Sequence, residues 1–416
     1  MPGDAKTHLF DPVRALASVR HEFGEHGGVN LSIETSSTFT VMEAGVMPEI
    51  FQGMRGPEAG GCYLYGRHFN PTVLVLARQL AAIESAQSAY CTASGMGAIS
   101  GVILQCCNSG DHVVASDTLY GGTWAFLHDF LPPKCGITTS FVDFTDLSAV
   151  AAAITPRTRV LYGESVSNPT LRVADVPALA ALARERGIKL VIDNTFSPLL
   201  LTPIRHGADV VVHSLTKFIN GASDLVGGAV CAKREFIDQL FDLHTGALML
   251  LGPTMDPRAA YEVAMRLPHL ALRIREHSAR AMELATNLES RGVAVCYPGL
   301  PSHPDHARFK HLANPGFGFG GMMTIDLGTL DRANRFMEHL QNQEAFGFMA
   351  VSLGYADTLM SASASSTSSE MDEAGLAQAG ISPGLVRLSV GFTGTLQDRM
   401  AQLERGLQSV GALSQS

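Results

Sequence analysis

Residues 189–228 decide the fold. They read K-L-V-I-D-N-T-F at 189–196, A-D-V-V-V-H-S-L-T-K-F at 208–218 and D-L-V-G-G at 224–228. Two short apolar runs, 190–192 and 210–212, each end in polar residues, as buried parallel strands do. Open α/β sheets bind ligands at the carboxyl ends of their strands. The stretch therefore predicts a parallel sheet whose binding edge carries Asp193, Ser214, Thr216 and Lys217.

One carboxylate, two hydroxyls and a lysine at one sheet edge match the requirements of pyridoxal 5′-phosphate (PLP). Lys217 would hold the cofactor covalently. Asp193, 24 positions earlier, would keep the pyridine nitrogen protonated, and the hydroxyls would bind phosphate oxygens. For this stretch alone, a helix-capping aspartate and a solvent-exposed lysine remain an equal alternative.

Length and composition describe an ordinary globular protein. The 416 residues predict two or three domains, with 46% hydrophobic and 17% charged residues. The net charge of −9 argues against nucleic acid or an anionic membrane as a partner. Neither a signal pattern nor a bilayer-spanning run is evident, and the seven cysteines include no C-x-x-C pair. We therefore expect a cytoplasmic protein with reduced thiols and without a metal site.

Strands and helices alternate through the first half of the chain. We expect strands over 112–116, 137–142 and 159–162, and helices over 147–154 and 176–186. This alternation predicts an α/β domain with a mostly parallel sheet and helices on both faces.

A different pattern follows residue 228. Residues 256–291 have helical apolar periodicity that Pro268 would kink, and strands are expected over 322–327 and 386–390. The last helix begins at Thr395, which is its capping residue. These elements predict a smaller C-terminal α+β domain. The expected division is an N-terminal arm on a neighbouring subunit (1–60), a cofactor-binding large domain (61–255) and the C-terminal domain (256–416). An ordinary surface loop is the alternative for the first segment.

Two further motifs offer groups for an anion. Y-L-Y-G-R-H-F-N-P-T at 63–72 places Tyr65 and Arg67 on one side of an extended segment, where the arginine suits a phosphate or an exposed structural pair. In S-G-M at 94–96, Gly95 and Met96 fall at a helix N-terminus, which is an anion site unless the small residues serve only close packing.

Two low-complexity stretches carry less weight. G-F-G-F-G-G at 316–321 precedes a strand rather than a helix, so a flexible turn is expected instead of a dinucleotide site. The serine-rich segment Ser361–Ser369 predicts a mobile loop near the mouth of a site.

These motifs together resemble the Cys/Met-metabolism family of PLP-dependent enzymes. S-G-M, Y-G-G-T, D-N-T-F, S-L-T-K and V-R-L-S-V-G occur in the family's order. The resemblance implies the aspartate aminotransferase fold (fold type I), whose large sheet is mostly parallel and of the seven-stranded type. Residues 20–30, 248–255 and 346–355 are most similar to plant-type methionine γ-lyases of that family. That similarity implies γ-elimination of L-methionine to methanethiol, 2-oxobutanoate and ammonia.

The resemblance also implies a role for each matched position, in a homodimer with shared sites that is usually paired into a tetramer. Lys217 would carry PLP, Asp193 would pair with the ring nitrogen, Asn168 would face the ring hydroxyl, and Tyr120 would stack on the ring and act as acid or base near the leaving group. The remaining roles are phosphate binding by Gly95, Met96, Ser214 and Thr216, phosphate binding in the neighbouring subunit by Tyr65 and Arg67, and substrate carboxylate binding by Arg387 and Ser352.

Some positions depart from the family's pattern and leave alternatives open. Gly122 stands where bacterial methionine γ-lyases have cysteine, and Asp357 replaces a glutamate. Cystathionine γ-synthase, cystathionine γ-lyase and O-acetylhomoserine sulfhydrylase activities, by γ-replacement or by elimination on related substrates, are the alternatives. An inactive scaffold or a cofactor-free lysine aldolase is disfavoured, because neither requires Asp193 together with a phosphate cradle.

Overall fold

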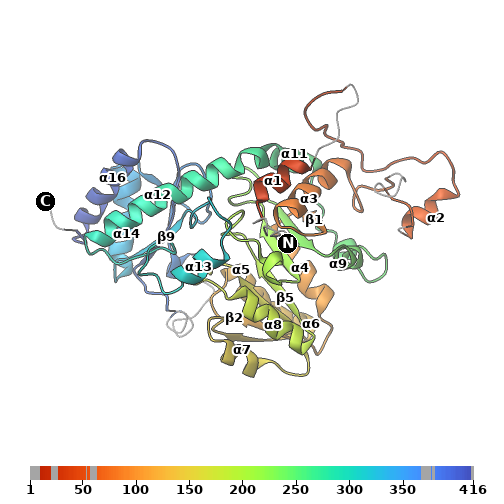
Figure 1. The fold of residues 1–416 in the computed structure, drawn as a ribbon, viewed down its shortest axis with the longest axis horizontal. Coiled ribbons are helices and arrows are strands. Elements are labelled where there is room, and N and C mark those ends of the chain that lie inside the picture. Colours follow the sequence, from red (N-terminus) through yellow and green to blue (C-terminus); the bar gives the residue numbers. More distant parts are fainter. Residues whose placement is uncertain are drawn as a thin grey trace, which may run out of the picture.

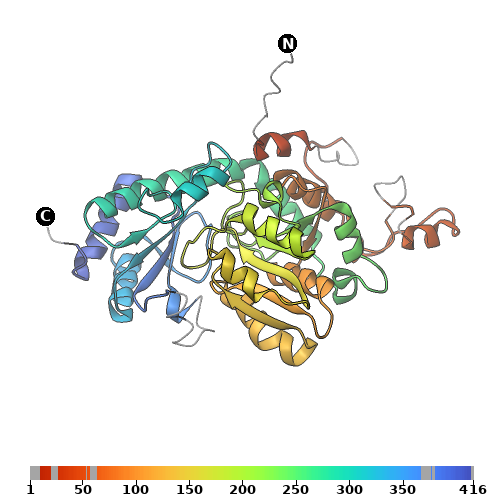
Figure 2. The ribbon, with the colours of Figure 1, turned by 60° about the horizontal axis from the view of Figure 1, so that its bottom comes forward.

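The computed structural model describes residues 10–19, 27–52, 54–56, 63–366, 376 and 380–413. Figures 1 and 2 show two lobes side by side, with the chain's early residues extending away from the larger one. Each lobe is built around one sheet, with seven strands in the larger lobe and five in the smaller. The expected α/β fold with a second, smaller sheet domain is confirmed.

The large sheet has the strand order β1-β7-β6-β5-β4-β2-β3. Its five strands from β6 to β3 run parallel, whereas β7 is antiparallel to both of its neighbours. The strands are β1 Ser88–Thr92, β2 His112–Ser116, β3 Thr138–Val142, β4 Thr158–Glu164, β5 Lys189–Asp193, β6 Val210–Ser214 and β7 Gly228–Ala232.

Helices cover both faces of this sheet because the strands are apolar on both sides. Val211 packs in one core and Val210 and Val212 in the other, as strand alternation requires. The first face carries α1 Pro12–Ser18, α3 Pro71–Ile83, α7 Leu147–Ala153, α8 Val176–Arg186 and α11 Pro257–Arg266. The second carries α4 Gly95–Cys106, α5 Gly121–Ala125, the π-helix Phe126–Phe130, α6 Leu131–Cys135, α9 Arg234–Leu240 and α10 Ala247–Leu251.

The smaller lobe has the strand order β10-β11-β12-β9-β8, in which only β10 and β11 are parallel. Its strands are β8 Val295–Cys296, β9 Met322–Asp326, β10 Gly347–Met349, β11 Thr358–Ala362 and β12 Leu385–Ser389. Its helices include α12 Leu270–Ser290, α14 Leu330–Asn342 and α16 Leu396–Ser409, whereas α13 His306–Leu312 packs Phe309 and Leu312 into the core of the large lobe. In Figure 1 the long α12 runs from the large lobe across the smaller one.

Pro268 breaks the helix that was expected to kink. Helix α11 ends at Arg266, a 3₁₀ turn covers Leu267–His269, and α12 begins at Leu270. Proline lacks a backbone N–H and its ring clashes with the preceding turn. The first helix therefore ends before Pro268, and a separate helix begins after it. The cap of α16 is as predicted, because Thr395 Oγ1 accepts from the backbone N–H of Asp398 at 3.1 Å.

The structure corrects two other expectations. Ser361 is not in a loop: it lies in β11, is 5% exposed and is paired in register with Arg387, because neighbouring strands bury it. A 3₁₀ turn over Ser363–Ser365 follows, and residues 367–369 lie outside the described residues. The segment with Tyr65 and Arg67 is not extended: Tyr65 forms an isolated bridge with Thr38, and residues 66–68 turn.

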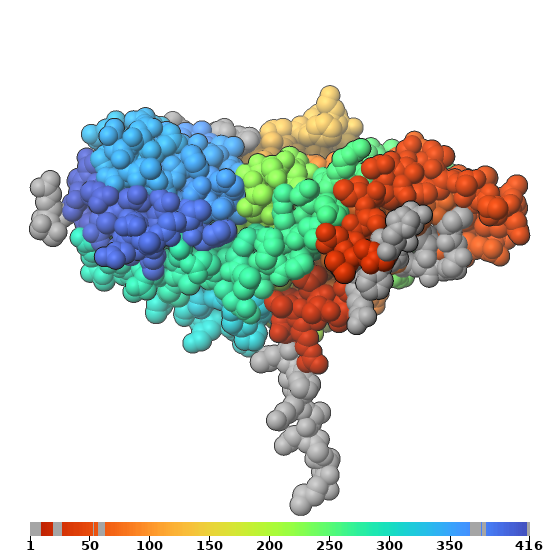
Figure 3. Space-filling view, turned by 90° about the horizontal axis from the view of Figure 1, so that it is seen from above, coloured from red at the N-terminus to blue at the C-terminus, as the bar shows by residue number. Residues whose placement is uncertain are grey.

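Residues 27–52 and 54–56 pack on the large lobe at Leu31 but are mostly exposed beyond it. Their helix α2, Val46–Phe51, lies far from both sheets in Figure 1, and Figure 3 shows the segment projecting from one end of the molecule. Met42 is 98% exposed and Val29 79% exposed. Across the described residues, no helix is both long and apolar enough to cross a membrane. The predicted domain boundaries at 60/61 and 255/256 stay predictions.

Candidate active site

A cavity of about 210 Å³ lies at the carboxyl ends of β4, β5 and β6. The N-terminus of α4 closes one side, and loops of the smaller lobe close another. The residues that line it are Ser94, Gly95, Met96, Ile99, Tyr120, Glu164, Val166, Asn168, Asp193, Thr195, Phe196, Ser214, Thr216, Lys217, Val226, Val351, Leu353 and Arg387.

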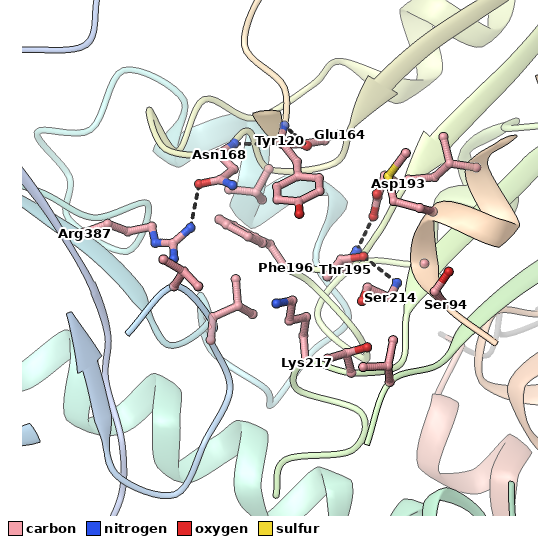
Figure 4. Close-up of a pocket in the computed structure, with 18 residues that line it drawn as sticks. Ser94, Tyr120, Glu164, Asn168, Asp193, Thr195, Phe196, Ser214, Lys217 and Arg387 are labelled. Carbon is pink, nitrogen blue, oxygen red and sulfur yellow. Dashed lines mark hydrogen bonds between the residues drawn. The ribbon is translucent and has the colours of Figure 1, made fainter. Parts of the chain in front are cut away.

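Asp193 is the last residue of β5 and lies on the wall of this cavity (Figure 4). Its Oδ1 accepts from the backbone N–H of Thr195 at 2.9 Å, and Tyr162 Oη donates to Oδ2 at 3.5 Å. Burial raises the pKa of Asp193, while the hydrogen bonds from Thr195 and the nearby His213 oppose that rise. A carboxylate in this setting needs a cationic or N–H-bearing ligand.

Glu164 ends β4, in direct register with Asp193. Its Oε1 accepts from the backbone N–H of Tyr120 at 2.8 Å, and its Oε2 accepts from that of Asn168 at 2.8 Å. Burial, followed by the charge of Asp193, raises the pKa of Glu164 to about 8. Glu164 therefore ties together the two loops that carry Tyr120 and Asn168.

Lys217 lies in the turn that follows β6, and its amine points into the centre of the cavity (Figure 4). Its Nζ donates to Ser352 Oγ at 3.0 Å. Burial and then the charge of Arg387 lower the pKa of Lys217 to about 8. The neutral, nucleophilic amine is therefore accessible near neutral pH.

The N-terminus of α4 supplies an anion cradle. Ser94 caps the helix, with Oγ accepting from the backbone N–H of Gly97 at 3.0 Å. The first-turn N–H groups of Gly95 and Met96 have no partner within the helix and carry its positive dipole end. A Cβ on Gly95 would come within 2.8 Å of the Cβ of Ser214, so only glycine lets the helix approach the end of β6 so closely. This close approach places Ser214 beside the free N–H groups.

Arg387, in β12, is the cation at the opposite end of the cavity. It is 2% exposed, and its Nη1 donates to Asn168 Oδ1 at 2.9 Å while Nη2 donates to the backbone carbonyl of Ser352 at 3.2 Å. Burial lowers the pKa of Arg387 to about 10, which leaves the group charged at neutral pH. Among the residues that the structure describes, none of its hydrogen-bond acceptors is a carboxylate, and its buried Nε has no partner. The fork therefore suits an incoming carboxylate.

This set of donors and acceptors fits PLP. A buried carboxylate, an accessible lysine amine and a helix N-terminus lie around one cavity, which matches the nitrogen, aldehyde and phosphate of that cofactor. The predicted residues Gly95, Met96, Tyr120, Asn168 and Arg387 line the cavity, as do Asp193, Ser214, Thr216 and Lys217.

Two groups of residues differ from the sequence-based expectation. Tyr65 and Arg67 do not line this chain's cavity. Arg67 Nη1 donates to the backbone carbonyl of Met249 at 2.6 Å, and its guanidinium lies 5.6 Å from the ring centre of Tyr65. Glu164, Thr195 and Phe196 do line the cavity, although the sequence did not single them out as site residues. Their signal was available, because each follows or ends a strand beside a predicted position.

Comparisons with known proteins agree with this geometry. Residues 14–408 match the family described as Cys/Met metabolism PLP-dependent enzyme. The chain is 57% identical to a methionine γ-lyase of Arabidopsis thaliana, over 95% of this chain and 90% of that protein. A solved cystathionine γ-synthase from Xanthomonas oryzae pv. oryzae, in complex with cystathionine, is similar with a TM-score of 0.86 and 32% identity, over 97% and 99% of the two chains.

A further similar structure contains the cofactor itself. The solved structure of a Campylobacter jejuni protein holds N′-pyridoxyl-lysine-5′-monophosphate and is similar with a TM-score of 0.88 and 27% identity. The similarity covers 96% of this chain and all of that one. The fit of the cavity to PLP is therefore matched by a related fold in which a lysine carries a pyridoxyl group.

Proposed function

The chain belongs to the Cys/Met-metabolism family of PLP-dependent enzymes, and we propose that it is a carbon–sulfur lyase acting on L-methionine. The net reaction is γ-elimination: methionine and water give methanethiol, 2-oxobutanoate and ammonia. One observation carries the proposal: Lys217, Asp193 and Arg387 meet around one cavity, as a PLP enzyme acting on an amino acid requires. The 57% identity to a methionine γ-lyase supports this choice of substrate.

The cavity residues divide between cofactor and substrate. Lys217 would hold PLP covalently, Asp193 would face its ring nitrogen, and Asn168 its ring hydroxyl. The phosphate would lie at the N-terminus of α4, near Ser214 and Thr216. When bound, PLP supplies a ring that withdraws electrons from the substrate's Cα and so makes its proton acidic.

Lys217 and Tyr120 would move the protons of the reaction. With its pKa lowered to about 8, Lys217 Nζ can be neutral and so can take the Cα proton once it is free. The Tyr120 hydroxyl points into the cavity (Figure 4), where it could give a proton to the leaving sulfur. The backbone of Tyr120 is held by Glu164, so the position of this hydroxyl depends on that carboxyl.

The remaining surface of the cavity indicates the class of substrate. Arg387, with Ser352 beside it, offers the substrate's carboxylate a charged fork. Val226 and Val351 line the cavity yet are 59% and 69% exposed, and Leu353 continues this apolar wall. An uncharged thioether side chain suits such a wall better than the charged far end of cystathionine does. Methionine is therefore favoured within the family.

Product analysis tests the proposal directly. The purified enzyme is incubated with methionine, cystathionine, cysteine or O-acetylhomoserine, each with and without an added thiol. A lyase releases 2-oxobutanoate and methanethiol from methionine alone. If keto acid appeared only with another substrate, or products formed only when a thiol was supplied, the enzyme would be a lyase of different specificity or a γ-replacement enzyme.

We propose further that the catalytic unit is a homodimer with shared sites, paired into a tetramer. Tyr65 is 44% exposed outside its own cavity, beside Arg67, and both would reach the phosphate of a second copy. The exposed apolar residues Met42 and Val29, in the preceding segment, suit such an interface.

A cytoplasmic location is part of the same proposal. The six cysteines in the described part of the chain are all free thiols. Cys106 and Cys107 are neighbours in sequence, and burial raises the pKa of each to about 12, so neither is reactive. Unpaired thiols suit a reducing compartment, and fractionation of the source cells followed by immunodetection would test the location.

A further inference from the structure

The turn that carries Lys217, residues 215–220, is bound by an arginine of helix α12. Arg273 Nη1 donates to the backbone carbonyl of Phe218 at 2.5 Å, and its Nη2 donates to the backbone carbonyl of Ile219 at 2.8 Å. Its Nε donates to His269 Nδ1 at 3.1 Å, which orients the plane of the guanidinium. Arg273 does not line the cavity, so it contacts the active site through the two residues that follow Lys217.

The turn leaves these two carbonyl groups to Arg273. The backbone N–H of Gly221 donates to the carbonyl of Lys217 at 2.8 Å and closes the turn. In the described part of the chain, no other hydrogen bond reaches the carbonyls of Phe218 and Ile219, and both residues are 1% exposed. A buried carbonyl without a donor is costly, so the guanidinium supplies two hydrogen bonds that the turn lacks.

Within the described residues, Arg273 forms hydrogen bonds to neutral acceptors and no ion pair. Its neighbour Arg266, by contrast, pairs with Asp224 at 2.7 Å. Burial, followed by the charge of Arg266, lowers the pKa of Arg273 to about 10, so the group stays charged at neutral pH. The turn makes room for it, because Gly221 has a φ of +74° and a Cβ there would collide with Arg273 Nη1. The charge of Arg273 therefore serves the turn rather than a carboxylate.

Helix α12 joins the cores of the two lobes. Leu270 and Ile274, in its first turns, pack in the core of the large lobe, whereas Leu284 and Leu288 pack in the core of the smaller lobe. Figure 1 shows this helix running from one lobe across the other. Arg273 lies between Leu270 and Ile274 in the sequence, so it fastens the turn to the helix that spans both lobes.

The turn also contacts a loop of the smaller lobe. A Cβ on Gly354 would lie 2.5 Å from the backbone nitrogen of Phe218, so the loop backbone packs directly on the turn. Two residues earlier, Ser352 accepts from Lys217 Nζ at 3.0 Å through its hydroxyl and from Arg387 Nη2 at 3.2 Å through its carbonyl. The turn is thus held by α12 and by the loop that contacts Arg387.

We propose that Arg273 is a positioning residue that holds Lys217 at a fixed place relative to Arg387. Its guanidinium ties the turn to α12, and α12 belongs to the lobe whose strand β12 carries Arg387. The inference rests on the proposed function, in which Lys217 takes the Cα proton and Arg387 holds the substrate's carboxylate. A base has to lie within about 2.6–3.2 Å of the group whose proton it takes, so loosening the turn slows proton transfer and leaves carboxylate binding in place.

Hydrogen exchange of the apoenzyme tests the contact without the cofactor. Arg273→Met removes both hydrogen bonds, and backbone N–H exchange in a peptide covering residues 215–221 should become about tenfold faster or more, as loss of a charged hydrogen bond implies. The control is Arg275→Met, an exposed arginine of the same helix that donates to the carbonyl of Gly316 at 3.1 Å. It should leave this exchange unchanged. Unchanged exchange in Arg273→Met would overturn the proposal.

Kinetics with methionine and Cα-deuterated methionine test the effect on Lys217. In Arg273→Met, kcat should fall about ten- to hundredfold while KM stays within about twofold of wild type. The isotope effect on kcat should increase, because proton transfer becomes slow relative to the other steps. A protein that is merely less stable would keep the wild-type isotope effect, and Arg275→Met should keep all three values.

Arg273→Lys provides the same test should Arg273→Met fail to fold. Lysine keeps the charge but lacks the fork, so faster exchange and lower kcat should both appear at smaller size. A loosened turn with unchanged kcat and isotope effect would overturn the inference alone. A wild-type enzyme that carried no pyridoxyl group on Lys217 after borohydride reduction would reject the proposed function and the inference with it.

Discussion

The cavity edge of the large sheet and the segment 27–56 represent opposite ways of arranging functional side chains. At the edge, Asp193 and Glu164 each end a buried strand and accept hydrogen bonds from loops beside them. In the segment, Met42 and Met54 are 98% and 62% exposed, and helix α2 lies away from both sheets. In the first region, the side chains form their hydrogen bonds within one chain. The second displays apolar surface that a monomer does not cover.

Arg67 lies where these two regions would meet. The Arg67 guanidinium donates one hydrogen bond to the backbone carbonyl of Met249 in its own chain. It lies outside the cavity of that chain. If the segment packs on a second copy, Arg67 completes the partner's site. If the segment does not pack on a second copy, each chain must build its active site from its own residues. The predictions below separate these cases, starting with the largest expected effect.

Lys217→Ala should abolish covalent PLP attachment and nearly all methionine turnover. Without the amine there is no group to hold PLP covalently or to take the Cα proton, so methionine turnover should fall by about 10³-fold or more. Borohydride reduction and peptide mass spectrometry should find a pyridoxyl group on Lys217 in wild type and on no lysine in the variant. Lys310→Ala, at an exposed position of α13, is the matched control. A pyridoxyl group retained on the Lys217→Ala chain would contradict the assignment.

Arg387→Leu should remove substrate binding while leaving the cofactor in place. Loss of a charged, two-pronged hydrogen bond to the substrate carboxylate is worth about 2–4 kcal/mol in kcat/KM for every amino-acid substrate. Arg387→Lys should also be poor, because it lacks the planar fork. Steady-state kinetics, PLP absorbance and melting temperature are compared with those of Arg335→Leu, an exposed arginine of α14. An unfolded or cofactor-free protein, or full kcat/KM, would remove Arg387 from the substrate site.

The rate at which apoenzyme captures PLP should depend on pH through Lys217. Burial and Arg387 lower the pKa of Lys217 to about 8, and only the neutral amine reacts, so the rate should rise about fiftyfold from pH 6 to 8 and level off above about pH 9. Stopped-flow absorbance measures this rate. Arg387→Leu removes one cause of the lowering, so the midpoint should move upward. A rate that continued to climb toward pH 10 would show that the amine is not perturbed.

Arg67→Ala should weaken PLP binding about ten- to hundredfold, as loss of a charge-assisted phosphate contact would. The decisive measurement is complementation. When Arg67→Ala and Lys217→Ala chains exchange subunits, each hybrid dimer has one site with both intact groups, so activity should recover. Failure to recover, after mass spectrometry has shown that hybrids form, would mean that each chain builds its site alone.

The same contrast explains which features the sequence could predict. Val210–Val212 and the polar residues after them follow a local pattern, so the strand, the sheet edge and Lys217 were predictable. Glu84 contacts His213 across 129 positions, so no local pattern reveals that contact. Ser361 was wrongly placed in a loop because serine-rich composition does not show that two strands will bury it. The dimer contact of Tyr65 and Arg67 stays a prediction.

Met42→Gln should have the smallest effect, and it addresses the segment alone. Met42 is 98% exposed in one chain, whereas a partner surface would bury part of its side chain. Partial burial is worth about 0.7 kcal/mol per copy, so a symmetric dimer should lose about 1.4 kcal/mol, or about tenfold in its dissociation constant. Analytical ultracentrifugation measures the dissociation constant, with Leu330→Gln in α14, 38% exposed, as the control on the other lobe.

The substitution should act on association alone. Because glutamine is polar and similar in length to methionine, the fold and the cavity of each chain should be unaffected, and PLP bound by Lys217 should absorb as in wild type. Weaker association by Met42→Gln but not by Leu330→Gln would place the interface at the segment, and equal association constants for both variants and wild type would show that the segment's apolar surface is not what joins the subunits.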